Sequence, residues 1–447
     1  SAPSTTAAYM LWADTSNNIL KMRNSANDGW IDLRTLTGGL TTSADATINS
    51  LTVGKGANSV AGNTVLGESA LDASVSGGDN TAVGNSALTT LTSGASNVAV
   101  GHDALKLNTT GGFNVAIGST ALDANTTAEA NVAVGNAALT ENTTGHSNVA
   151  VGANTLDANT TANNNTAVGA AALGANTTGT QNVAVGAFAL DANTTANENT
   201  AVGYNAASAN TTGAANTIMG HNSFDANTTG GSNVAIGAQS LSSNTTASNN
   251  VSIGAFCMRD NTTGASNTGV GKGALTHLTT SSNNTAIGTN ALNLATTGSL
   301  NSAVGAFALD AVTTGGENTA MGEGSLSSLT TGTGNSAFGR QALVSATTPS
   351  NNTGIGFKAL QLNTTGERNT ALGMQALAST TTGTNNVAVG VNSLYTATTA
   401  SSNTACGDAA LFANTTGENN TAMGRNALFA NTTGDLNTAV GANALDA

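Results

Sequence analysis

Apolar and polar residues follow a pattern that returns every 17 residues from Asn63 onward. If the first Asn of each repeat is called position 0, it recurs from Asn63 to Asn437 in 23 repeats without insertion or deletion. Position +3 is apolar, position +4 is Gly, position +8 is apolar and mostly Leu, and positions +12 and +13 are Thr-Thr from Thr109 to Thr433. A constant short period is typical of a repeat architecture.

Each repeat predicts one short strand bounded by turns. Val132, Ala133 and Val134 have the apolar character and period two of a strand, and the Gly, Asn and Thr around them favour turns. A helical repeat needs ~30 residues or more, so this period is too short for one. We therefore predict an all-β fold, a parallel β-solenoid of about 23 coils of 17 residues. At a strand spacing of ~4.8 Å the rod is roughly 110 Å long.

Charge is restricted to a few repeat positions. Every Asp, Glu, Lys and Arg after residue 62 falls at position +5, +6, +9, +10, +15 or +16. Because the interior of a coil must exclude charge, we expect the apolar residues at +3 and +8 to fill it. We expect the Asn at position 0 to form amide ladders and the Gly at +4 to adopt a positive φ at a corner. Representative structural positions are Asn97, Val100, Gly101, Leu105, Asn114, Ile117, Gly118 and Leu122.

Three segments differ in composition. Residues 1–45 contain three apolar runs separated by polar turns, which predicts a small β-meander that serves as an attachment module. Trp12 and Trp30 lie in it, as structural core or as attachment residues. Residues 46–62 form a transition in which Leu51, Val53 and Gly54 approach the repeat pattern, and residues 63–447 form the solenoid shaft.

Net charge and cysteine content narrow the function classes. The net charge is −13, and an acidic rod is not a nucleic-acid binder. Neither a signal peptide nor a run of 18 apolar residues is visible, so we expect no membrane insertion. Cys406 stands in the +3 column and Cys257 in the small +7 column, and we expect both to be core residues without a disulfide.

Residues with catalytic or metal-binding chemistry are scattered. His102, His146, His221 and His277 occupy surface columns on different coils, and we expect them to have no partners. Aspartates at position +9, such as Asp157 and Asp191, occur at most once per coil, which predicts at best loose cation binding and does not resemble a tight Ca²⁺-binding repeat. No nucleophile elbow, phosphate loop or carboxylate pair stands out. We therefore expect no catalytic residues, no metal site, no cofactor and no enzymatic activity.

One composition shift within the array leaves two interpretations open. Position +11 is Asn in ten consecutive repeats and then apolar in five, at Leu278, Ala295, Val312, Leu329 and Ala346. This apolar run indicates either a contact with a partner or repacking inside the rod.

The repeat Asn-Thr-Ala-Val-Gly-x-x-Ala-Leu-x-x-Asn-Thr-Thr-Gly resembles repeats in tail fibres and other virion appendages of bacteriophages, especially cyanophages. The entry segment Leu51 to Gly56 and the N-terminal run Leu11 to Thr15 are similar to the corresponding parts of such fibres. The resemblance implies an extracellular virion protein built as a parallel homotrimeric fibre. The N-terminal module would bind tail or capsid proteins, and the distal end would contact a host cell-surface receptor.

Two other functions compete with the phage fibre. The motif Asn-x-Ala-Val-Gly is also similar to the head repeats of trimeric autotransporter adhesins, although those repeats are shorter. A bacterial surface adhesin or extracellular filament is therefore the main alternative. Regular ranks of Thr on a solenoid also suggest ice binding, but of two adjacent Thr on a strand only one points outward.

Overall fold

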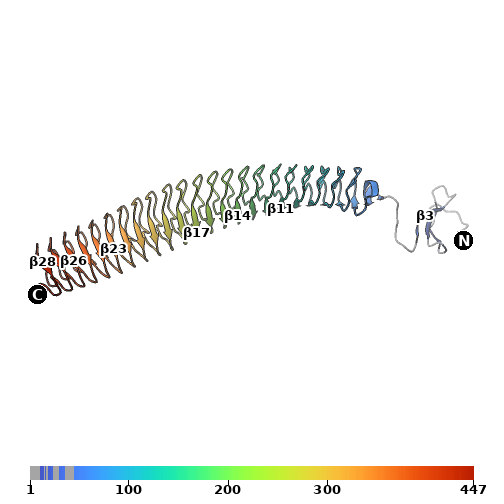
Figure 1. Cartoon of the computed structure of the whole chain (residues 1–447). Helices are drawn as coiled ribbons and strands as arrows, with labels where there is room; N and C mark the ends of the chain where they lie inside the picture. Colours follow the sequence, from blue (N-terminus) through green and yellow to red (C-terminus); the bar gives the residue numbers. More distant parts are fainter. Residues whose placement is uncertain (1–10, 15, 17–18, 24–29, 36–44, 447) are drawn as a thin grey trace.

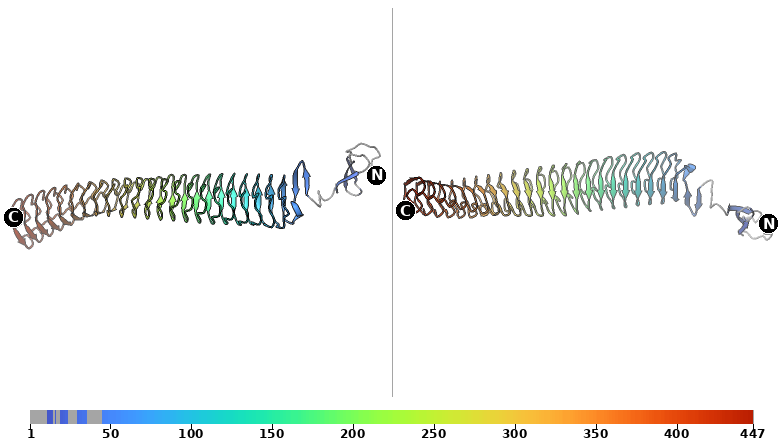
Figure 2. Two further views of the ribbon diagram at one scale, coloured as in Figure 1. Left: turned by 90° about the horizontal axis from the view of Figure 1, so that it is seen from above. Right: turned by 60° about the horizontal axis from the view of Figure 1, so that its bottom comes forward.

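The computed structural model describes residues 11–14, 16, 19–23, 30–35 and 45–446. They form a small sheet near the N-terminus and a long rod of stacked coils (Figure 1). Figure 2 shows the rod from two further directions, and in every view the coils follow one another along a gently curved axis. The predicted all-β solenoid is confirmed.

The N-terminal sheet consists of β1 (Leu11–Asp14), β2 (Ile19–Arg23) and β3 (Trp30–Thr35). The strands pair antiparallel in chain order, and a bulge interrupts the pairing of β2 with β3 between Leu20 and Lys21. This is the three-stranded meander that the alternating apolar runs and polar turns predict.

A hairpin precedes the first coil of the rod. Strands β4 (Ala46–Ile48) and β5 (Leu51–Gly54) pair antiparallel, β5 pairs antiparallel with β6 (Thr64–Gly67), and the 3-10 turn η1 (Ala57–Ser59) follows β5. The Asp45 carboxylate accepts hydrogen bonds from the backbone N of Lys55 and Gly56 at 2.7 and 2.6 Å. In the segment 46–62, predicted as a transition, β5 pairs with β6 and so covers an edge of β6 that would otherwise be unpaired.

Parallel strands run from β6 to the C-terminal end of the rod. Each residue of one strand pairs with the residue 17 positions later, as Val132 pairs with Val149. After β6 the strands are β7 (Thr81–Val83), β8 (Val98–Val100), β9 (Val115–Ile117), β10 (Val132–Val134), β11 (Val149–Val151), β12 (Thr166–Val168), β13 (Val183–Val185), β14 (Thr200–Val202), β15 (Thr217–Met219), β16 (Val234–Ile236), β17 (Val251–Ile253), β18 (Thr268–Val270), β19 (Thr285–Ile287), β20 (Ser302–Val304), β21 (Thr319–Met321), β22 (Ser336–Phe338), β23 (Thr353–Ile355), β24 (Thr370–Leu372), β25 (Val387–Val389), β26 (Thr404–Cys406), β27 (Thr421–Met423) and β28 (Thr438–Val440).

Backbone hydrogen bonds also join the coils outside the strands. Leu105 N at position +8 donates to Ala121 O in the next coil at 3.0 Å, and Gly118 N at position +4 donates to Val100 O in the preceding coil at 2.8 Å. Positions +1, +6, +10, +12 and +16 make similar bonds between coils along the rod. Each coil is therefore stabilised mainly by its two neighbours, as expected for a quasi-one-dimensional protein.

The rod interior is filled by small residues and one Leu per coil. In a representative coil Ala99 at +2, Ala104 at +7 and Leu105 at +8 are completely buried, together with Asn97 and Asn108. The expectation that Leu at +8 fills the interior is confirmed.

The expectation that position +3 points inward is wrong. Val100 is only half-buried, and Ile117 is 41% exposed, whereas Ala99 and Ala116 at position +2 are fully buried. Side chains alternate between the two faces of a strand, so an inward +2 forces +1 and +3 outward. Cys406 at +3 is accordingly exposed rather than a core residue.

The structure decides between the two interpretations of the apolar run at position +11, a partner contact or repacking inside the rod. Leu278, Ala295, Val312, Leu329 and Ala346 are all completely buried. They replace an interior Asn with an interior aliphatic side chain. The run is therefore repacking inside the rod and presents no surface to a partner.

The Gly at position +4 has the predicted positive φ. Gly101 and Gly118 have φ of 143° and 141°, and a Cβ on Gly101 would overlap the carbonyl of Gly118 in the next coil. The sequence did not predict that Leu105 and Leu122 also lie in the left-handed region, with φ of 51° and 53°. Packing of the Leu side chain and the bonds between coils hold these residues in a conformation that L-residues rarely adopt.

Candidate functional surfaces

The buried amide ladder at position 0 is the most regular polar feature of the rod. Asn114 donates from its backbone N and its Nδ2 to Asn97 Oδ1 at 3.0 and 3.2 Å, and its Nδ2 also donates to Ala128 O at 2.9 Å. The predicted ladder is confirmed. Because each amide satisfies backbone groups of its own coil and of the neighbouring coil, it fixes the register of the stack.

A second ladder at position +11 was not predicted as a ladder. Asn125 Nδ2 donates to Asn108 Oδ1 at 2.9 Å and to Ala128 O at 3.2 Å, and both side chains are buried. The sequence signal for this ladder is the Asn at position +11 in ten consecutive repeats, which by itself predicts only a turn. Stacked amides are structural, and neither ladder offers a group to a ligand.

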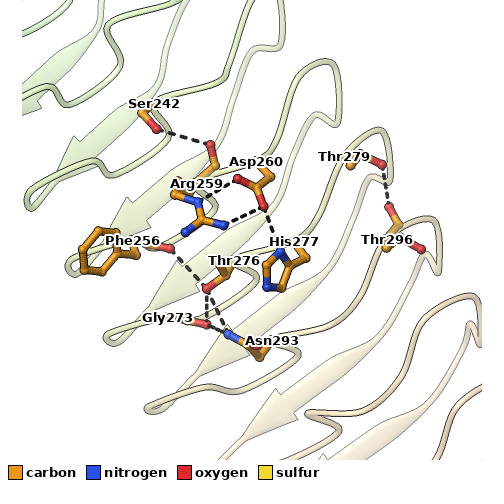
Figure 3. Close-up of polar contacts among 10 residues, drawn as sticks. All are labelled: Ser242, Phe256, Arg259, Asp260, Gly273, Thr276, His277, Thr279, Asn293 and Thr296. Carbon is orange, nitrogen blue, oxygen red and sulfur yellow. Dashed lines mark hydrogen bonds and ion pairs between the residues drawn. The ribbon is translucent and has the colours of Figure 1, made fainter.

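Figure 3 shows a cluster of three ionisable side chains on two adjacent coils, Arg259, Asp260 and His277. Arg259 binds Asp260 through two hydrogen bonds, Nε to Oδ1 at 2.7 Å and Nη2 to Oδ2 at 3.0 Å. His277 Nδ1 lies 2.8 Å from Asp260 Oδ2. The Arg259 guanidinium, with His277 beside it, holds the pKa of the Asp260 carboxyl below its usual range.

This cluster resembles part of a catalytic triad but lacks its nucleophile. The Thr276 hydroxyl donates to Gly273 O at 2.8 Å and accepts from Asn293 Nδ2 at 3.0 Å, so its hydrogen bonds lead away from His277 (Figure 3). A triad needs a hydroxyl or thiol bonded to the base. We interpret the cluster as a surface ion-pair network, of a kind that contributes little to stability.

The expectation that the histidines have no partners is wrong. Besides His277, His102 Nδ1 lies 3.3 Å from Asp103 Oδ2, and His146 Nδ1 lies 3.3 Å from Ser147 Oγ. The His221 ring stacks on Tyr204 with ring centroids 5.5 Å apart. Each of these contacts joins either neighbours in the chain or residues in adjacent coils. Such contacts follow from the short repeat and do not indicate a metal or catalytic site.

Five of the seven aspartates at position +9 are partly buried along one side of the rod. Burial raises the pKa of Asp123, Asp157, Asp191, Asp225 and Asp310, and in each it is the largest effect. The Oδ1 atoms of Asp123 and Asp310 are buried without a hydrogen-bond partner. The sequence located this column but gave no indication of its burial.

The Asp157 and Asp191 carboxylates approach each other over an intervening glycine. A Cβ on Gly174 would lie 3.5 Å from Asp157 Oδ1 and 3.3 Å from Asp191 Oδ1. Calcium takes six to eight oxygen ligands, and two carboxylates supply too few. In residues 45–446 and the described N-terminal strands no group of three or more His, Cys, Asp or Glu side chains could hold a metal ion.

The two cysteines differ in environment. Cys257 is a buried core residue as expected, and burial raises the pKa of its thiol to about 11. Cys406 lies on the outer face of β26. Both are free, in agreement with the expected absence of a disulfide between them.

The predicted attachment residues lie in the N-terminal sheet. Trp12 in β1 is half-buried, and Lys21 Nζ lies 5.7 Å from the centre of its ring, which is within the range of a cation–π contact. Trp30 begins β3, and its side chain lies outside the described part of the structure. Attachment through these residues stays a prediction.

The outer face of the strands forms a surface that the sequence reasoning missed. Position +1 is Val, Thr or Ser and position +3 is Val, Ile, Leu, Met, Phe or Cys in every repeat. Met219, Met321 and Met423 at +3 are 50, 43 and 47% exposed. The +1 and +3 side chains of β6 to β28 thus form one uncharged band along the rod, which we call the strand stripe.

The adjacent threonines have different environments. Thr109 Oγ1 at position +12 donates to Thr126 O in the next coil at 3.0 Å, and this bond recurs along the rod. Thr110 at position +13 is exposed and lies in a bend, not in a strand. From Thr110 onward the Thr at +13 is therefore exposed in every coil, but in a bend, so the argument from strand alternation does not apply.

In the part of the chain that the structure describes, no helix has the length and apolar character needed to cross a membrane. No protein-family model, no curated protein and no solved structure matches the chain.

Proposed function

We propose that the chain is a structural protein, the shaft of a fibre on a phage virion. The observation that supports this best is the unbroken register of the rod, in which each strand from β6 to β28 pairs with the residues 17 positions later. Such a stack fixes a length of roughly 110 Å between its ends. A spacer of fixed length needs regularity along its whole axis, and the described coils have it.

The proposal gives each part of the chain a role. The N-terminal sheet of β1 to β3 attaches the fibre to tail or capsid proteins, and the opposite end extends toward a host cell-surface receptor. Three copies run parallel in one fibre, as the resemblance to phage fibres implies. The proposal includes no reaction, no cofactor and no nucleic acid.

A bacterial surface adhesin or extracellular filament is the alternative, and it would use the rod in the same way. A rod of fixed length serves a cell surface as well as a virion. The rival ice-binding function requires the exposed Thr at +13 to order water, and it predicts thermal hysteresis in a freezing assay. Location separates the first two functions, since both use the same fold.

The test is to locate the protein with an antibody against residues 1–45. On purified virions we expect immunogold labels at the particle surface, each at the near end of a rod of roughly 110 Å. Labels on cell envelopes and none on virions would contradict the phage assignment and support the adhesin. An antibody against the last coils is the matched control, because it should label the far end of the same rods.

A further inference from the structure

The strand stripe has no charged residue although it faces outward. The exclusion of charge from positions 0, +2, +7, +8, +11 and +14 is explained by burial inside the coil. Positions +12 and +13 are polar threonines in most coils. Apart from the Gly at +4, positions +1 and +3 are the remaining uncharged surface columns. Position +3 is apolar in every coil and position +1 is Val in 8 coils and Thr or Ser in 15, so burial within a single chain does not explain the absence of charge there.

The strand stripe is long enough for a stable contact. At roughly 110 Å by about 9 Å it covers on the order of 1,000 Å², with an apolar residue at +3 in every coil and Thr or Ser at +1 in 15 of the 23 coils. A stable interface buries about 800 Å² on each partner. Parallel sheets are also usually covered on both faces, and here the strands have apolar residues on both.

We infer that the strand stripe is the surface through which copies of this chain pack lengthwise against one another. The inference rests on the proposed role as a multi-chain fibre and names its contact surface. An occupant that covers every coil must match the length of the stripe and the strand spacing over the whole rod. A second copy of the same chain meets both conditions, since it has the same stripe with the same period.

The distribution of charge favours the same contact. The array contains 20 acidic and 7 basic residues, so two rods repel each other over most of their surface. All of these charges occupy columns +5, +6, +9, +10, +15 and +16, which lie outside the strands. The strand stripe is therefore the face on which two copies approach without bringing like charges together.

The first test measures the mass of the full chain by light scattering during size-exclusion chromatography. We expect a multiple of the monomer mass of 43.3 kDa at micromolar concentration. A variant with five Asp substitutions in the stripe should have the mass of the monomer. A variant with five Asp substitutions in the exposed Thr column of the same coils should keep the mass of the wild type. The stripe variant replaces Val134, Val151, Val168, Val185 and Val202, and the control replaces Thr144, Thr161, Thr178, Thr195 and Thr212.

A monomeric wild-type chain overturns the inference, and so does a stripe variant whose mass is unchanged. Circular dichroism checks that both variants keep their strands. Neither measurement depends on where the rod is found, so the interface holds or fails separately from the phage assignment.

The second test needs no disruptive substitution. Ile253 at position +3 of β17 lies in the middle coil of the array, so it faces its own copy whether two chains run parallel or antiparallel. In a Cys406→Ser background, Ile253→Cys should give dimers with a bifunctional maleimide, and Thr263→Cys in the exposed Thr column should not. Cys257 stays unreacted because it is buried. Equal cross-linking of the two variants, or none at Ile253→Cys, overturns the inference.

Discussion

At the scale of single residues, stability depends on which column a side chain occupies. Leu190 at +8 is completely buried, and Thr195 at +13 of the same coil is exposed. We expect Leu190→Ala to lower the free energy of unfolding by ~2–5 kcal/mol, because it removes buried surface and leaves a cavity. Thr195→Ala should change it by less than ~0.5 kcal/mol. Chemical denaturation followed by circular dichroism measures both, and equal losses would contradict the assigned interior.

The buried amide at position 0 gives a second residue-scale prediction. Asn199 accepts from Asn216 N at 3.0 Å and donates to Gly213 O at 2.9 Å. Asn199→Ala leaves these buried backbone groups without partners, at a cost of ~1–3 kcal/mol for each. Asn136→Ala, which truncates an exposed Asn, is the control. Hydrogen exchange should rise at Asn216 in the first variant only, and unchanged protection there would show that the ladder does not fix the register.

At the scale of the strand and the column, the position of the strand followed from the sequence, but which of its two faces points into the rod did not. Val132, Ala133 and Val134 form a strand as their alternation predicts. Alternation also places +1 and +3 on one face, and this is correct. It does not say which face is inside, because a strand with Ala on one face and Val on the other is apolar on both. The size of the side chains favours an inward +3, whereas the structure places mostly Ala on the inward face of the strand and large buried side chains at +8 and, in some coils, at +11.

The aspartate column gives a pH dependence with a definite sign. Burial raises the pKa of five of the aspartates at +9, so at these sites the folded chain binds protons more tightly than the unfolded chain. Their destabilising effect is therefore present near neutral pH and is relieved as the pH falls toward the ordinary Asp value of ~4. Asp260, whose pKa is lowered, acts in the opposite direction but is one residue against five.

We expect the melting temperature to rise as the pH falls from 7 toward 4. The measurement is thermal unfolding by circular dichroism in buffers of equal ionic strength. Replacing Asp123, Asp157, Asp191, Asp225 and Asp310 by Asn should raise the melting temperature at pH 7 and flatten its pH dependence. A melting temperature that falls on acidification in the native chain would contradict the burial of this column.

At the scale of the whole molecule, the rod should tolerate the loss of complete coils. Deleting residues 165–198 removes two repeats and joins Asn164 to Asn199, so the register of every remaining column is kept. We expect the rod to shorten by ~10 Å without unfolding, because each coil contacts only its neighbours. Electron microscopy measures the length. A deletion of 26 residues from Asn165 is the control, since it breaks the period and should disrupt the stack; equal tolerance of both deletions would contradict a register-dependent rod.

The sequence by itself determined the period, the strand in each repeat, the Asn ladder at position 0 and the Gly corner, because each depends on local backbone preferences repeated without interruption. It also determined the six repeat positions at which all charged residues of the array fall. Only the tertiary structure decided that Ala99 points inward and Val100 outward, and that β5 covers the edge of the first coil. The physical reason is that the inward face and the outward face of each strand are both free of charge. The two look alike in the sequence until the direction of each side chain is known.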